Sequence, residues 1–185
     1  SPPVMDSMVA RVIFFWTRQT AAGFALNISA GVGFATGPAN ERAVAISAVN
    51  NSARSDDGRR RSDSNAIIFL SGGGPPTLVA QAELTSLDAD GFTLNWTAND
   101  NQPYIIHYIA LGGDISAARA DTFNLTTGAG NQAVTGAGFR PDFVIFLWSF
   151  TENVDTNTAN AEIGIGFAKS ATQRGALVNA SRDNI

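Results

Sequence analysis

Hydrophobic and polar residues alternate along several short stretches of the chain, and this alternation predicts β-strands. The clearest stretch places Phe92, Leu94 and Trp96 on one face and Thr93, Asn95 and Thr97 on the other. Such a strand buries one face and leaves the other in water. Residues 78–85 alternate in the same way, and Asp90-Gly91 between the two stretches is a dipeptide typical of tight hairpin turns. The pattern therefore predicts a β-hairpin here, with Trp96 facing the core.

Other short segments are apolar on both faces, at residues 9–17, 66–70, 104–111 and 142–150. A strand of this kind is either central in a layered fold or covered by a neighbouring subunit. Gly, Pro, Asn and Asp separate these segments, and helical periodicity is nearly absent. We expect ten to twelve short strands in an all-β fold, an antiparallel β-sandwich of the jelly-roll kind.

The two ends of the chain carry the same sequence pattern. The matching stretches are residues 12–17 with 144–149, residues 31–35 with 164–168, and Arg42 with Arg174. The spacing is 132 residues for the first and third matches and 133 for the second. This places the one-residue difference in the turn after the glycine-rich stretch. Three strands with Trp, Gly-X-Gly-Phe-Ala and Arg in the same order indicate an internal duplication.

The duplication predicts a first β-sandwich unit over residues 1–135 and an incomplete second copy over residues 136–185. The second copy either adds strands to the first sandwich or is completed by residues beyond 185, and we favour the latter. In each copy the glycines of Gly-X-Gly share one strand face, which indicates the close approach of a bulky group. The ring of Trp16 or Trp148 from the preceding strand is the favoured candidate, and an aromatic group of a partner is the alternative.

Composition narrows the possible functions. The net charge of −4 argues against non-specific binding to nucleic acid or acidic membranes, and no apolar run is long enough to span a membrane. The chain has no cysteine for disulfides or thiolate metal sites. Its one histidine, His107, shares a strand face with apolar residues, and we predict a half-buried structural role. We find no G-x-S-x-G motif, and we predict no catalytic, cofactor-binding or metal site and no enzyme activity.

Residues 53–65 form the one charge-rich stretch, in which four arginines and three aspartates are interleaved. A nucleic-acid-binding patch shows a basic excess with interleaved aromatic residues, and this stretch has neither. We interpret it as a polar loop that is either solvated or ordered by docking onto a neighbour.

Five phrases of the sequence carry a resemblance. They are VIFFWTRQTAAG, GVGFATG, DADGFTLNWT, IIHYIALGGD and NQAVTGAGFRPDFVIFL. Together they resemble uncharacterised, repeat-containing virion structural proteins of tailed bacteriophages, of the decoration and fibre-associated types. The resemblance implies a capsid decoration or cement subunit, or a tail or fibre component, in the phage particle after synthesis in the host cytoplasm. It implies no active-site residues.

The residues themselves agree with a homo-oligomer that packs against copies of itself or against other virion proteins. The candidate interface residues are Phe15, Trp16, Arg59, Arg60, Trp148 and Phe150. The alternative hypothesis is a carbohydrate-binding, lectin-like β-sandwich. Trp96 with Asn99, Asp100 and Asn101 would supply its site, although the alternation places Trp96 in the core.

Overall fold

The computed structural model describes residues 11–20, 27–49, 56–72, 75–151 and 153–182. These residues form twelve β-strands, paired in antiparallel ladders, and no helix. The strands are β1 (Arg11–Thr20), β2 (Ile28–Ala35), β3 (Glu41–Ala48), β4 (Gly58–Ser62), β5 (Ile67–Leu70), β6 (Leu78–Leu87), β7 (Phe92–Ala98), β8 (Tyr104–Leu111), β9 (Val144–Trp148), β10 (Thr158–Ala159), β11 (Ala161–Ala168) and β12 (Arg174–Ser181). The prediction of an all-β, antiparallel chain is confirmed.

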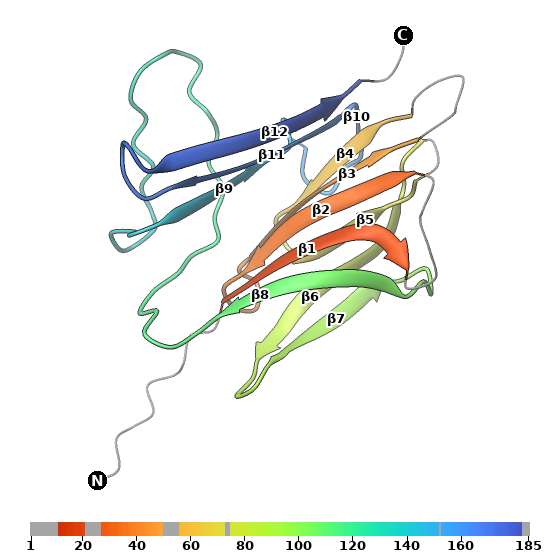
Figure 1. Ribbon diagram of the computed structural model, residues 1–185, viewed down its shortest axis with the longest axis horizontal. Coiled ribbons are helices and arrows are strands. Elements are labelled where there is room, and N and C mark those ends of the chain that lie inside the picture. Colours follow the sequence, from red (N-terminus) through yellow and green to blue (C-terminus); the bar gives the residue numbers. More distant parts are fainter. Residues whose placement is uncertain (1–10, 21–26, 50–55, 73–74, 152, 183–185) are drawn as a thin grey trace.

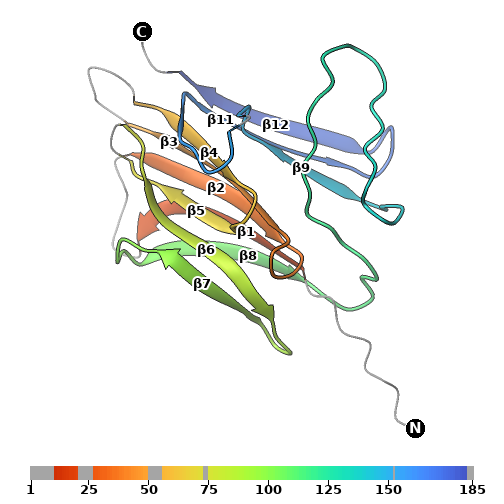
Figure 2. The same cartoon turned by 180° about the vertical axis from the view of Figure 1, so that it is seen from behind.

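The strands form three sheets (Figures 1 and 2). The main sheet has the order β10-β4-β3-β2-β1-β8, and the covering sheet has the order β5-β6-β7. The C-terminal sheet has the order β12-β11-β9, with β11 close to β3 and β4. Residues 112–143, which contain no strand, connect β8 to β9 along the side of the molecule.

The core lies between the main sheet and the covering sheet. Strand β5 is apolar on both faces, as its sequence predicted, and all four of its side chains are fully buried. The backbone carbonyl of Ala66 lies directly over Gly33 of β2, where a β-carbon would collide with it. The predicted β6-β7 hairpin is confirmed, and the amide of Asp88 donates to the carbonyl of Gly91 at 2.9 Å across its turn.

A buried carboxylate ties the two layers together at one end of the core. Glu41 begins β3, and its side chain is fully buried. The backbone amide of Leu84 in the covering sheet donates to Glu41 Oε2 at 2.9 Å. Burial raises the pKa of Glu41 to about 6, and the nearby charge of Glu83 adds to the rise, while the hydrogen bond from Leu84 opposes it.

The main sheet and the C-terminal sheet contain strand triplets with the same pairing register. Trp16 of β1 lies opposite Gly31 of β2, and Trp148 of β9 lies opposite Gly164 of β11. In both places a β-carbon on the glycine would collide with the indole ring. The tryptophan of the preceding strand is therefore the bulky group that these two glycines accommodate.

The register corrects one part of the sequence alignment. In β3, Glu41 lies opposite Ala35, and in β12 Arg174 lies opposite Ala168. Arg174 therefore occupies the place of Glu41 rather than that of Arg42, and the spacing stays at 133 residues through the turn. The two turns also share a hydrogen bond, from the amide of residue 36 or 169 to the carbonyl of residue 40 or 173. The one-residue difference thus falls between the first and second strands of each triplet.

The prediction of a loop at residues 53–65 is wrong in its second half, because β4 covers Gly58–Ser62. Residues 53–55 lie outside the described residues. The three arginines of β4 keep most of their side chains buried, with the charged ends on acidic residues. Because two of those acids lie about 100 residues along the chain, the local sequence gave no sign of this strand.

Candidate functional site

Strand β12 forms an open edge of the C-terminal sheet and is exposed on both faces. Successive side chains of a strand point to opposite faces, and Leu177 and Val178 are 69% and 56% exposed. Their equivalents in β3 by register, Val44 and Ala45, are 7% and 0% exposed. The free edge of β12 also carries backbone amides and carbonyls that no neighbouring strand of the described chain pairs.

Strand β8 forms the open edge at one end of the main sheet. Its exposed apolar side chains lie on both faces, with Tyr108 on the face of Phe14 and Ile105, Ile109 and Leu111 on the opposite face. His107 lies on the same face as Ile109, as predicted, but it is exposed, so the prediction of a half-buried histidine is wrong. The edge position of β8 explains the exposure, since no strand of the described chain pairs with its outer side.

The aromatic residues predicted as interface anchors divide into three kinds. Trp16 is 2% exposed and belongs to the core, where it packs against Phe69 with ring centroids 5.7 Å apart. It therefore cannot serve as an interface anchor, which corrects that prediction. Phe15 and Trp148 are half-buried, and Trp148 covers Gly164. The side chain of Phe150 is 58% exposed, so it remains available to a partner.

The two arginines predicted as interface residues act within the chain. Arg59 donates from Nη1 to the carbonyls of Ala159 and Asn160, at 2.7 and 2.9 Å, and from Nη2 to that of Phe150 at 3.0 Å. It also pairs with Glu162 of β11 at 3.5 Å. Arg60 donates from Nη1 to Asn157 Oδ1 at 3.3 Å and forms an ion pair with Asp155 at 3.6 Å. Arg59 thus fastens β11 to the main sheet, and Arg60 fastens the segment between β9 and β10.

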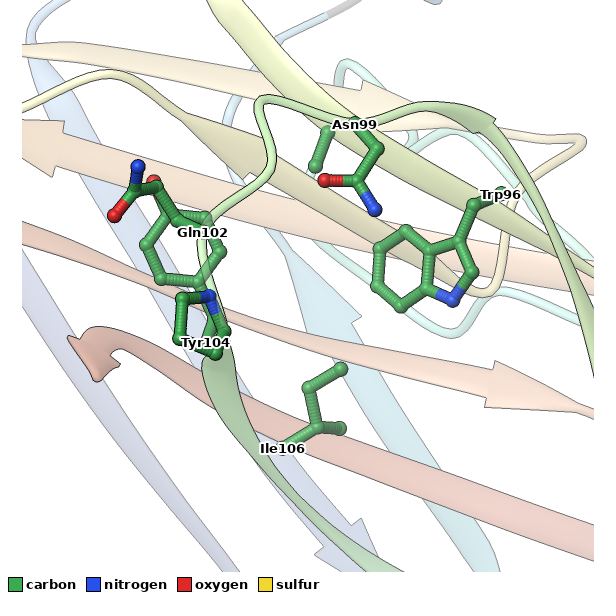
Figure 3. Close-up of a pocket in the computed structure, with 7 residues that line it drawn as sticks. Trp96, Asn99, Gln102, Tyr104 and Ile106 are labelled. Atoms are coloured by element: carbon green, nitrogen blue, oxygen red, sulfur yellow. The ribbon is translucent and has the colours of Figure 1, made fainter. Parts of the chain in front are cut away.

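A small cleft opens between β7 and β8, at the end of the core near residues 98–103. It has a volume of about 200 Å³ and is lined by Ala80, Trp96, Asn99, Gln102, Pro103, Tyr104 and Ile106. Figure 3 shows the indole of Trp96 and the amide of Asn99 on one side, Gln102 and Tyr104 on the other, and Ile106 between them. None of the lining residues carries a charge.

Neighbouring contacts fix the shape of this cleft. The Tyr104 ring stacks on Phe69 of the core at a centroid distance of 4.7 Å. Its hydroxyl donates to Asp100 Oδ2 at 2.6 Å. The side-chain oxygen of Asn99 accepts the backbone amide of Asn101 at 2.7 Å, which holds the turn before Tyr104. The aromatic wall and the turn therefore exist before any ligand arrives.

Trp96 corrects a detail of the sequence prediction. The residue follows Phe92 and Leu94 on the face of β7 that packs toward the core, as the alternation predicted. It lies near the end of the strand, however, and is 37% exposed. The alternation of apolar and polar residues predicts which face of the strand a side chain lies on. It does not predict how far the opposite sheet extends over that side chain.

The described residues contain no group of three or more His, Cys, Asp or Glu side chains that could hold a metal ion. Within the same residues, no helix is long and apolar enough to cross a membrane. The cleft presents uncharged aromatic and amide groups, and the edge strands β8 and β12 present exposed apolar side chains. Comparison with protein-family models, curated proteins and solved structures gives no match to the chain.

Proposed function

We propose that this protein is a virion structural protein of tailed bacteriophages, of the decoration or fibre-associated type, which acts by packing against further copies of itself. The sequence resemblance to such proteins supports this function. The observation that carries it is the exposure of Leu177 and Val178 on opposite faces of one edge strand. Large apolar residues exposed together at a sheet edge are typical of an interaction surface.

The proposal includes the duplication. On this view β1-β2-β3 and β9-β11-β12 are two copies of one β unit, and the first forms a two-layer sandwich with the covering sheet. The equal register and the tryptophan-over-glycine contact in both triplets support it. The second triplet has no covering sheet among the described residues, which leaves its surface for a partner.

The partner that fits the β12 edge best is β8 of a second copy. Both strands are eight residues long, both lie at the end of their sheet, and both expose large apolar side chains on two faces. Pairing them would satisfy two unpaired backbone edges and bury Leu177 against residues such as Ile109. Because the two edges differ, the contact is head-to-tail and can repeat from copy to copy.

Light scattering coupled to size-exclusion chromatography tests this arrangement. The wild-type protein should form oligomers that grow with concentration, and Leu177→Lys and Ile109→Lys should each stop the growth. An equimolar mixture of the two variants should give a heterodimer, because one retains a working β8 edge and the other a working β12 edge. Leu125→Lys is the matched control, since Leu125 is exposed in the connection between β8 and β9 and lies on neither edge.

A wild-type chain that stays monomeric at every concentration would overturn the assembly. Loss of association in Leu177→Lys but not in Ile109→Lys would replace the head-to-tail contact by a symmetric pairing of two β12 strands. Mass spectrometry of purified particles of a phage that encodes the chain tests the virion role. Absence of the chain from those particles would contradict it.

A further inference from the structure

We infer that the cleft between β7 and β8 binds one neutral pyranose ring of a carbohydrate. The site consists of Trp96, Asn99, Gln102 and Tyr104, with Ile106 at its floor. This binding activity goes beyond the proposed assembly. None of the substitutions that test the assembly lies in the cleft.

The size of the cleft limits its ligand to a single small ring. Pockets for drug-sized molecules measure roughly 300–1,000 Å³. The cleft holds about 200 Å³. An extended ligand such as a proline-rich peptide needs a longer groove with further aromatic residues along it, whereas Trp96 and Tyr104 are the two aromatic residues that line this cleft.

The chemistry of the lining matches a sugar ring, which has an apolar C–H face and hydroxyl groups around its edge. The partly exposed indole of Trp96 offers a flat apolar surface for the C–H face. The side-chain amides of Asn99 and Gln102 offer groups that donate to and accept from hydroxyls. The absence of charge from the lining favours a neutral sugar over a charged one.

The cleft is also built in advance, which lowers the entropy lost on binding. Tyr104 is held by Phe69 on its ring face and by Asp100 at its hydroxyl. Asn99 is held by its hydrogen bond to the Asn101 amide, which leaves the Nδ2 group of Asn99 to face the cleft beside Trp96.

Two-dimensional ¹H–¹⁵N NMR on the full chain tests the inference directly. The panel consists of neutral monosaccharides, namely glucose, galactose, mannose and N-acetylglucosamine. At least one of them should shift the indole N–H resonance of Trp96 in a saturable way, and Trp96→Phe identifies that resonance by its loss. A glycan array then shows which linked sugars contain the preferred ring.

Variants in the cleft and on the opposite face of β7 test whether binding depends on the cleft. Trp96→Ala should weaken binding by about tenfold or more, as expected for the loss of a central aromatic contact. Trp96→Phe should retain part of it, and Gln102→Ala should weaken it by about fivefold. Asn95→Ala is the matched control, because Asn95 lies on the opposite face of β7 and should leave binding unchanged.

Three results would overturn the inference. One is saturation by no sugar in the panel or on the array, and another is binding that Trp96→Ala leaves intact. The third is a proline-rich peptide that shifts the Trp96 resonance while sugars do not. Circular dichroism of each variant confirms that it is folded, and Trp96→Phe keeps the test valid if Trp96→Ala fails to fold.

Discussion

The triplets β1-β2-β3 and β9-β11-β12 pair in the same register but differ in what lies against them. In the first, the Ala66 carbonyl just before β5 lies over Gly33, β4 extends the edge of β3, and β8 extends the edge of β1. In the second, β9 and β12 are both edge strands, and apolar side chains of β12 reach solvent on two faces. The strand pairing is therefore encoded within the triplet, whereas burial depends on the elements that surround it.

We expect the largest difference in stability between the triplets when each of the two tryptophans is replaced. Trp16→Ala removes a buried ring from the core and should lower the free energy of unfolding by about 3–5 kcal/mol. Trp148→Ala removes a half-buried ring and should cost about 1–2 kcal/mol. Urea unfolding of both variants measures the difference. Equal losses would show that the C-terminal sheet is as well covered in solution as the main sheet.

The next pair compares the second glycine of each Gly-X-Gly stretch. Gly33→Ala places a methyl group against the Ala66 carbonyl and should cost about 3 kcal/mol, because backbone on both sides must move. In Gly166→Ala the new methyl group lies 3.3 Å from the Gly175 carbonyl oxygen and 3.4 Å from the Trp148 ring, so we expect a loss below about 1 kcal/mol. Urea unfolding should rank Gly33→Ala far below Gly166→Ala in stability, and the reverse order would contradict the difference in covering.

A smaller effect depends on pH. The pKa of Glu41 is about 6 in the native state against an ordinary value of 4.5, so the native state holds this proton more tightly than the unfolded chain. The stabilisation is complete below pH 4.5 and is lost as the pH rises through about 6. The free energy of unfolding should therefore fall by about 2 kcal/mol from pH 4.5 to pH 7 through this group.

Glu41→Gln should remove this part of the pH dependence, as measured by urea unfolding at several pH values. Arg174→Gln is the matched control, because Arg174 occupies the equivalent place in β12 and is exposed. The control should leave the pH profile unchanged. An unaltered profile in Glu41→Gln would mean that another group is responsible for the slope.

The smallest effect concerns the attachment of the C-terminal sheet. Arg59→Ala removes three hydrogen bonds to the carbonyls of residues 150, 159 and 160 and the ion pair with Glu162. We expect local opening of β11 and β12 to become easier by about 1 kcal/mol, which makes their amide hydrogens exchange roughly fivefold faster. Exchange in β5 should not change. Arg119→Ala, at an exposed ion pair, is the control and should leave exchange in β11 and β12 unaltered.

Local patterns predicted the parts of the fold that depend on neighbours in sequence. Asp90-Gly91 and the alternation on both sides of it define the β6-β7 hairpin, since turn and face are both set within about 20 residues. The apolar run of β5 predicted a strand covered on both faces, and that strand is fully buried. These features need no knowledge of the rest of the chain.

The remaining features depend on distant partners. The arginines of β4 are typical of a loop until acids such as Asp155 and Glu162 are placed beside them. His107 is exposed because β8 pairs with β1 at the end of the sheet, a contact between residues about 90 positions apart. For the cleft, the sequence singled out Trp96 and Asn99, but it gave no sign of Gln102 and Tyr104. Those two come into place only when β8 crosses to the other layer.

The short strand β10 makes the two ends of the main sheet different from each other. It pairs Thr158 and Ala159 with Arg59 and Gly58, so that a two-residue strand lies at the end of the main sheet opposite β8. A two-residue edge strand offers an added strand little backbone to pair with, whereas β8 offers eight residues. A filament built by the proposed contact of β8 with β12 would therefore have two chemically different ends, and a capping protein could arrest its growth by recognising just one of them.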